Sequence, residues 1–93
     1  MKNKVVWITG ASSGIGEALV YKLNALGAKL IISSRNREAL YQVKSKCKLS
    51  PIDVHVLQLD LQEIDKLPEI AQTAIRIFGR IDMIIHSGGL SQR

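Results

Sequence analysis

Strand-like and helix-like stretches alternate strictly along the 93 residues of this chain. Short apolar runs bounded by glycine or polar residues predict strands at 4–9, 30–32, 53–59 and 81–86. Apolar residues at helical spacing predict helices at 14–26, 36–47 and 70–78. This β-α-β-α-β-α-β order is typical of a parallel α/β sheet with helices on both faces.

Right-handed crossovers between parallel strands predict the strand order 3-2-1-4 of a doubly wound, Rossmann-type sheet. The first two helices are then expected on one face and the third on the other. In the first helix, the buried face is expected to carry Ile15, Ala18, Leu19, Leu23 and Leu26. One helix cannot cover the second face, and the fourth strand forms an open apolar edge. Residues 1–93 are therefore expected to be the N-terminal part of a single domain, truncated before the later strands.

The composition excludes several classes of protein. No apolar run approaches the ~18 residues of a membrane span, and none resembles the apolar core of a signal peptide. Cys47 is the only cysteine, which excludes an internal disulfide and favours a cytoplasmic setting. The net charge of +5 is scattered, and the chain has one Trp, two Tyr and one Phe, so nucleic acid is not an expected partner.

The turn between the first strand and the first helix carries the clearest chemical motif, Thr9-Gly10-Ala11-Ser12-Ser13-Gly14-Ile15-Gly16. Glycines there allow a tight turn and a close approach of the backbone to a pyrophosphate. The free N–H groups and the positive dipole end of the helix attract that group. A G-x3-G-x-G spacing between a strand and a helix indicates a dinucleotide site, and a turn without ligand is the alternative.

The residues after the second strand bear on which nucleotide is bound. A fold of this type that binds NAD usually places an acid about 20 residues after the glycines, against the ribose hydroxyls. Here the stretch reads Ser33-Ser34-Arg35-Asn36-Arg37, without an acid. Ser34 and Arg35 can donate to a 2′-phosphate, which favours NADP(H) over NAD(H) and disfavours S-adenosylmethionine. The alternative is that Arg35 and Arg37 are only surface charges.

Together these motifs resemble the short-chain dehydrogenase/reductase (SDR) family over essentially the whole chain. Residues 9–16 match its T-G-x-x-x-G-I-G signature, and further matches are Asp60-Leu61, Phe78-Gly79-Arg80-Ile81-Asp82 and the Gly-Gly pair at 88–89. The resemblance implies that the pyrophosphate is held by Gly10, Ser12, Ser13, Gly14, Ile15 and Gly16. It also implies that Ser34 and Arg35 bind the ribose phosphate, and Asp60 and Leu61 the adenine. His86 and Gly88, after the fourth strand, are expected to add minor cofactor contacts.

The chain departs from the family pattern at the end of the fourth strand. The family usually has Asn-Asn-Ala-Gly where this chain has His86-Ser87-Gly88-Gly89. The family's catalytic serine, asparagine and Tyr-x-x-x-Lys pair would lie beyond Arg93. Tyr21 and Tyr41 cannot replace that tyrosine, since neither has a lysine four residues on. No catalytic residue is therefore expected in this chain, and His55 is expected to be structural.

Two functions from different classes remain open. The first is the cofactor-binding half of an NADP-dependent oxidoreductase. The resemblance implies hydride transfer between the nicotinamide and a carbonyl or alcohol substrate, and a homo-oligomer. The second is a non-catalytic nucleotide-binding module, or a truncated product that acts by binding or oligomerisation. No metal is expected in either case, because neither a second cysteine nor a paired histidine gives a metal-ligand spacing.

Overall fold

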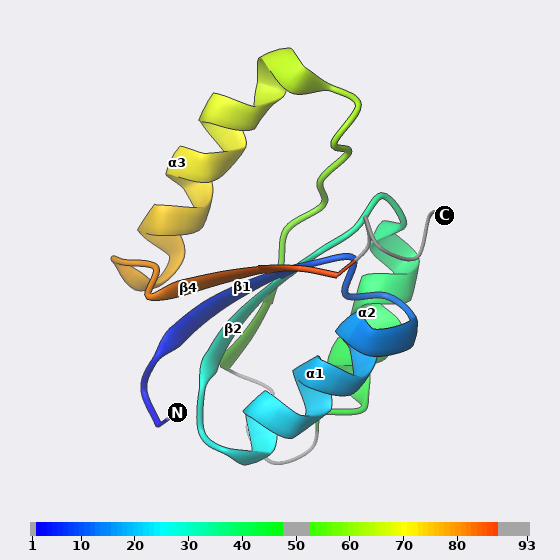
Figure 1. The fold of residues 1–93 in the computed structure, drawn as a ribbon, viewed down its shortest axis with the longest axis vertical. Helices are drawn as coiled ribbons and strands as arrows, with labels where there is room; N and C mark the ends of the chain where they lie inside the picture. The colour runs from blue at the N-terminus through cyan, green and yellow to red at the C-terminus, as the bar shows by residue number, and fades with distance from the viewer. Residues whose placement is uncertain (1, 48–52, 88–93) are drawn as a thin grey trace.

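Four parallel strands form one sheet in the predicted order, β3-β2-β1-β4. A computed structural model of the chain describes residues 2–47 and 53–87 (Figure 1). The strands are β1 (Val5–Thr9), β2 (Lys29–Ser33), β3 (Val54–Val56) and β4 (Met83–His86). The helices are α1 (Gly14–Ala25), α2 (Arg37–Ser45) and α3 (Leu67–Phe78), with a short 3-10 helix, η2 (Ile64–Lys66), directly before α3.

The core lies on both faces of β1, whose five residues are all buried. Val6 and Ile8 pack with residues of α1 and α2, whereas Val5 and Trp7 pack with residues of α3. Figure 1 shows the same division, with α1 and α2 on one side of the sheet and α3 on the other. The predicted distribution of helices is therefore confirmed, and it follows from the right-handed crossovers.

The predicted buried face of α1 is wrong in part. Ile15 and Leu26 are 69% and 50% exposed, whereas Gly16, Val20 and Leu23 are buried. The buried stripe therefore follows the i, i+4, i+7 spacing but starts one residue later, which is a rotation of about 100° around the helix. Placing Gly16 instead of Ile15 against the sheet brings the helix close to the turn that follows β1.

Strand β3 is shorter than the predicted 53–59. Beyond Val56, the amides of Leu57 and Leu59 still donate to the carbonyls of Ile32 and Ser34, at 3.0 Å each. Ile32 still belongs to β2, whereas Ser34 follows its end, where the chain leaves the sheet to enter α2. Residues 57–59 therefore remain hydrogen-bonded along the carboxyl edge of the sheet, although they are not part of β3.

An aspartate fastens the start of β4 to the start of β1. The Val5 amide donates to Asp82 Oδ2 at 2.8 Å, and the Asp82 amide donates back to the Val5 carbonyl at 2.8 Å. Arg80 Nε donates to the same carboxylate oxygen at 2.9 Å, and Arg80 Nη2 donates to the Asn3 carbonyl at 2.7 Å. The Val5 amide and the Arg80 guanidinium together lower the pKa of Asp82 below its usual 3.8.

We expect Asp82→Asn to lower the melting temperature by a few degrees at pH 7, because the neutral amide loses the charge that both donors favour. The pKa of Asp82 is lowered by folding, so its stabilisation is complete above pH 3.8 and disappears as the pH falls through the folded-state value. Thermal unfolding of both proteins between pH 7 and pH 3 measures this, and the two melting curves should converge at the acid end.

Glu63→Gln is the matched control, since the Glu63 carboxylate pairs, within the described part of the chain, with the exposed Lys66 ammonium three residues on, at 3.2 Å. Exposed pairs of this kind add little stability, so this variant should melt with the wild type throughout. A difference between wild type and Asp82→Asn that persists unchanged at pH 3 would contradict the proposed role of the Asp82 charge.

Candidate functional site

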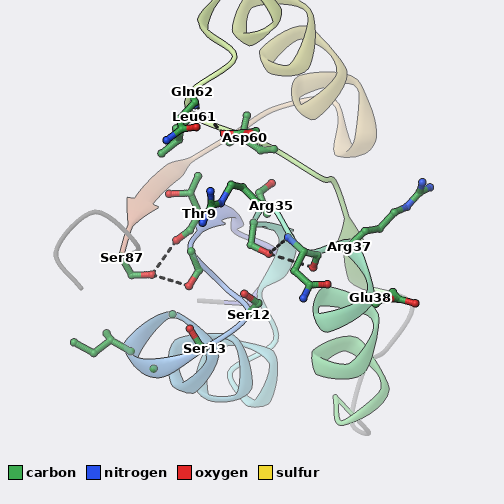
Figure 2. A pocket seen from close by; sticks show the side chains of 18 residues that line it. Thr9, Ser12, Ser13, Arg35, Arg37, Glu38, Asp60, Leu61, Gln62 and Ser87 are labelled. Atoms are coloured by element: carbon green, nitrogen blue, oxygen red, sulfur yellow. Dashed lines mark hydrogen bonds between the residues drawn. The ribbon is translucent and has the colours of Figure 1, made fainter. Parts of the chain in front are cut away.

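A pocket of about 1060 Å³ opens at the carboxyl ends of the strands (Figure 2). It lies where the strand order reverses, because β2 and β4 pair with opposite edges of β1. Open parallel sheets bind ligands at such a switch point. The lining comes from four segments that are distant in sequence: 9–16 without Ala11, 33–38, 59–62 and Ser87.

The glycine-rich turn after β1 forms one wall of the pocket. Gly10 and Gly14 have left-handed φ values of 70° and 58°, which residues with a Cβ rarely adopt. Ser13 precedes α1 in an extended conformation, and its side chain makes no capping hydrogen bond to the helix. The first amides of α1 are therefore not satisfied by that side chain, and they are suited to bind an anion.

Gly16 packs closely against Gly10 of this turn and against Ser87. A Cβ added to Gly16 would collide with Gly10 O and Ser87 Oγ, and it would lie 2.8 Å from the Gly10 carbonyl carbon. At Gly14, by contrast, an added Cβ would meet nothing within 4 Å. Gly16 is therefore required by packing, whereas Gly14 is required by backbone conformation.

The segment after β2 forms a second wall and supplies the positive charge. Asn36 Oδ1 accepts from the Ala39 amide at 3.0 Å and so caps α2. The Ser34 hydroxyl lies 3.2 Å from the Asn36 amide and 3.3 Å from its carbonyl oxygen. Gln58 Nε2 donates to the Arg35 carbonyl at 2.8 Å, which fixes the backbone beneath the exposed Arg35 side chain.

Figure 2 shows Arg35 extending across the pocket toward Thr9, whereas the side chains of Arg37 and Glu38, which also line the pocket, extend outward from it. Glu38, which is not among the predicted site residues, also lines the pocket, one residue after the 33–37 stretch that lacks an acid. It lies in the first turn of α2, where the positive end of the helix dipole stabilises a carboxylate. Its acid group therefore has a structural reason to be there that is independent of a ribose.

Asp60 and Leu61 line the wall opposite Ser12 and Ser13 (Figure 2). Asp60 Oδ1 accepts from the Gln62 amide at 2.9 Å, and the Asp60 carbonyl accepts from the Glu63 amide at 3.0 Å. Leu61 is 51% exposed at the rim. The turn is thus held by its own hydrogen bonds and leaves an apolar side chain free to contact a flat ring.

At the end of β4, the predicted site residue His86 lies outside the pocket lining, whereas its neighbour Ser87 belongs to it. His86 does not line the pocket, and its Nδ1 lies 2.7 Å from Thr9 Oγ1. Ser87, which in the sequence is only a departure from the family pattern, does line it. Gly88 lies outside the described residues. The pairing of Ser87 with the turn after β1 depends on strand register, so no local signal in the sequence identifies it.

Among residues 2–47 and 53–87, the two tyrosines, Tyr21 and Tyr41, do not line the pocket. Burial, and then the hydrogen bond to Glu17 at 2.6 Å, raise the pKa of Tyr21 to about 12. These described residues contain no group of three or more His, Cys, Asp or Glu suited to a metal ion, and His55 is exposed on β3. Nor does this part of the chain include a helix long and apolar enough to cross a bilayer.

Comparison with known proteins agrees with the fold. The family model described as short chain dehydrogenase matches residues 4–93. A human relative, dehydrogenase/reductase SDR family member 7, is 42% identical over 100% of this chain and 29% of its own length. A short chain dehydrogenase structure from Bacillus anthracis superimposes with a TM-score of 0.84 and 32% identity, over 92% of this chain and 34% of that one.

A 3-ketoacyl-(acyl-carrier-protein) reductase from Brucella melitensis, solved in complex with NADH, gives a TM-score of 0.79 at 25% identity. It covers 89% of this chain and 33% of that one. The chain thus spans about three-tenths of the length of the curated relatives it matches first. The match over residues 4–93 shows that it belongs to the short-chain dehydrogenase/reductase family.

Proposed function

We propose that this chain forms the NADP(H)-binding part of a short-chain oxidoreductase. The observation that carries the proposal is the pocket itself, in which a glycine-rich turn and a helix N-terminus face a second wall bearing Arg35. The first wall is suited to a pyrophosphate and the second to a further phosphate. The two anion-binding walls at one switch point support a phosphorylated dinucleotide.

Each wall has a proposed part of the nucleotide. The amides and hydroxyls of residues 10–16 bind the pyrophosphate, with Ser12 and Ser13 as the side-chain donors. Ser34 and Arg35 bind the 2′-phosphate, and Asp60 and Leu61 contact the adenine. The uncapped N-terminus of α1 and the exposed Leu61 support these assignments. Bound in this way, NADP(H) would supply the hydride chemistry, while the residues of this chain bind and orient it.

The choice of NADP(H) over NAD(H) depends on the end of β2. The Brucella melitensis reductase was solved with NADH, so a likeness to that structure does not by itself favour NADP(H). In this chain, an acidic side chain at 33–37 is absent from the sequence, and Arg35 points over the pocket (Figure 2). A guanidinium attracts a 2′-phosphate, whereas a ribose diol gains little from it.

The reaction and its setting are part of the same proposal. We infer that the complete enzyme moves hydride between NADP(H) and a carbonyl or alcohol carbon, and that it works as a homo-oligomer. The buried and unpaired thiol of Cys47 supports a reducing, cytoplasmic setting. Nucleic acid and membrane are not among the proposed partners.

Calorimetric titration with NADPH and NADH tests the cofactor assignment, with 2′,5′-ADP and 5′-AMP as the corresponding fragments. We expect NADPH and 2′,5′-ADP to bind at least about tenfold more tightly than their partners without the 2′-phosphate, because one charge-assisted pair is gained. Equal or tighter binding of NADH would contradict the NADP(H) assignment. Absence of binding by both dinucleotides would contradict the proposed function as a whole.

A further inference from the structure

The ends of β1 and β4 are joined by a side-chain hydrogen bond next to the glycine-rich turn. Thr9 and His86 are partners in the parallel register, and His86 Nδ1 lies 2.7 Å from Thr9 Oγ1. Thr9 is buried, with 4% of its surface exposed. Since Gly10 follows Thr9 directly, this bond fixes the last point of β1 from which the turn departs.

Ser87 adds a second attachment, directly to the turn. Its amide donates to the Thr9 carbonyl at 3.2 Å, and its hydroxyl lies 2.8 Å from that carbonyl and 3.2 Å from the Gly10 carbonyl (Figure 2). A hydroxyl has one proton to donate, so the two carbonyls share it. The same oxygen occupies the space where a Cβ on Gly16 would lie.

On its other side, the turn is held by a bond to β2. The Ala11 amide donates to the Ser33 carbonyl at 3.1 Å. The turn is thus hydrogen-bonded both to the end of β2 and to the residue that follows β4, and its position depends on both strands. A phosphate-binding turn gains affinity when its amides are fixed before the ligand arrives, because less ordering is required on binding.

We propose that His86 is a positioning residue for the nucleotide-binding turn, acting through the Thr9 hydroxyl and not through contact with the nucleotide. The imidazole does not line the pocket, whereas Thr9 does. Either neutral tautomer can form the bond, with Nδ1 accepting from the Thr9 hydroxyl or donating to it. The effect expected on NADPH binding rests on the proposed function, whereas the effect expected on hydrogen exchange of the turn does not.

Two substitutions of His86 separate the positioning role from a general need for a polar side chain. In asparagine a polar atom is bonded to Cγ, as Nδ1 is in histidine, so His86→Asn can still reach Thr9 Oγ1. In glutamine the polar atoms are one bond further out and correspond to Nε2. We expect His86→Gln to weaken NADPH binding about 3- to 10-fold, the size of one lost hydrogen bond, and His86→Asn to stay within about twofold of wild type.

Hydrogen exchange of the Ala11 amide in the full, ligand-free chain gives the second readout. We expect exchange to accelerate about 3- to 10-fold in His86→Gln and in Thr9→Val, and to stay near the wild-type rate in His86→Asn. Thr9→Val removes the same hydrogen bond by deleting its partner on β1, so the inference can still be tested if one of the two variants fails to fold. The double variant His86→Gln/Thr9→Val should be no faster than either single one.

The inference is overturned if His86→Asn and His86→Gln behave alike, or if the two single effects add in the double variant. Its failure is distinguishable from failure of the proposed function. If the wild type binds no dinucleotide but the variants show the expected exchange rates, the positioning role holds and the cofactor assignment is refuted. If the wild type binds NADPH but the variants do not show those exchange rates, the cofactor assignment holds and the positioning role is refuted.

Discussion

Replacing Gly16 with alanine is expected to weaken dinucleotide binding at least about a hundredfold. The new Cβ would overlap Gly10 O and Ser87 Oγ, and it would lie 2.8 Å from the Gly10 carbonyl carbon. Two of these three atoms are backbone, so the collision cannot be relieved by a change of rotamer. Either the turn after β1 or the start of α1 must move, and both form the wall proposed to bind the pyrophosphate. Titration of the variant with NADPH measures the loss.

Gly79→Ala is the matched control for this substitution. Gly79 ends α3 with a φ of 86°, and an added Cβ would meet nothing within 4 Å. The variant should lose about 1–2 kcal/mol of stability through backbone strain, because an L-residue disfavours this conformation, and should bind NADPH as the wild type does. If Gly16→Ala binds within threefold of wild type, the close packing at Gly16 does not govern the site. If both variants lose binding equally, the loss reflects stability alone.

The arrangement of strands and helices was predictable because its signals are local. Continuous apolar runs predict the strands, and glycine after Leu26 and after Phe78 ends a helix in each case. Strands β1 and β2 are buried on both faces, whereas β4 is largely exposed at the edge of the sheet. The handedness of crossovers then places the helices of a doubly wound sheet on its two faces. The rotation of α1 was not predictable in the same way. Ile15 is more hydrophobic than Gly16, but only a residue without a Cβ fits against Gly10 and Ser87.

The lining of the pocket was predictable where one short segment supplies it, as in residues 9–16 and in Ser34 and Arg35. The attachment of the turn to β4 was not predictable, because Thr9 and His86 are 77 residues apart and meet only through strand register. Periodicity gives the face of a strand but not its exact partner. Ser87 therefore appeared in the sequence as a departure from a family pattern, and only the fold shows what it contacts.

The double variant Ser34→Asp/Arg35→Ile is expected to reverse the cofactor preference, with NADPH binding falling about 100-fold and NADH binding rising about 3- to 10-fold. A carboxylate at 34 repels the 2′-phosphate and can accept from the ribose hydroxyls instead, while loss of Arg35 removes the guanidinium that extends over the pocket (Figure 2). Each change removes or reverses one charge interaction with the phosphate, and a factor of ten corresponds to about 1.4 kcal/mol. Parallel titrations with NADPH and NADH measure the ratio.

Arg37→Ile is the control that separates local recognition from the general positive field of the chain. It removes the same charge two residues away; Arg37 also lines the pocket, but its side chain extends outward and not across the pocket as that of Arg35 does (Figure 2). An exposed charge at that distance acts mainly through a field that salt screens, so the NADPH-to-NADH affinity ratio should change less than threefold at physiological ionic strength. If Arg37→Ile changes the ratio as much as the double variant does, the preference comes from net charge and not from the end of β2. An unchanged NADPH-to-NADH affinity ratio in the double variant would show that Ser34 and Arg35 do not recognise the 2′-phosphate.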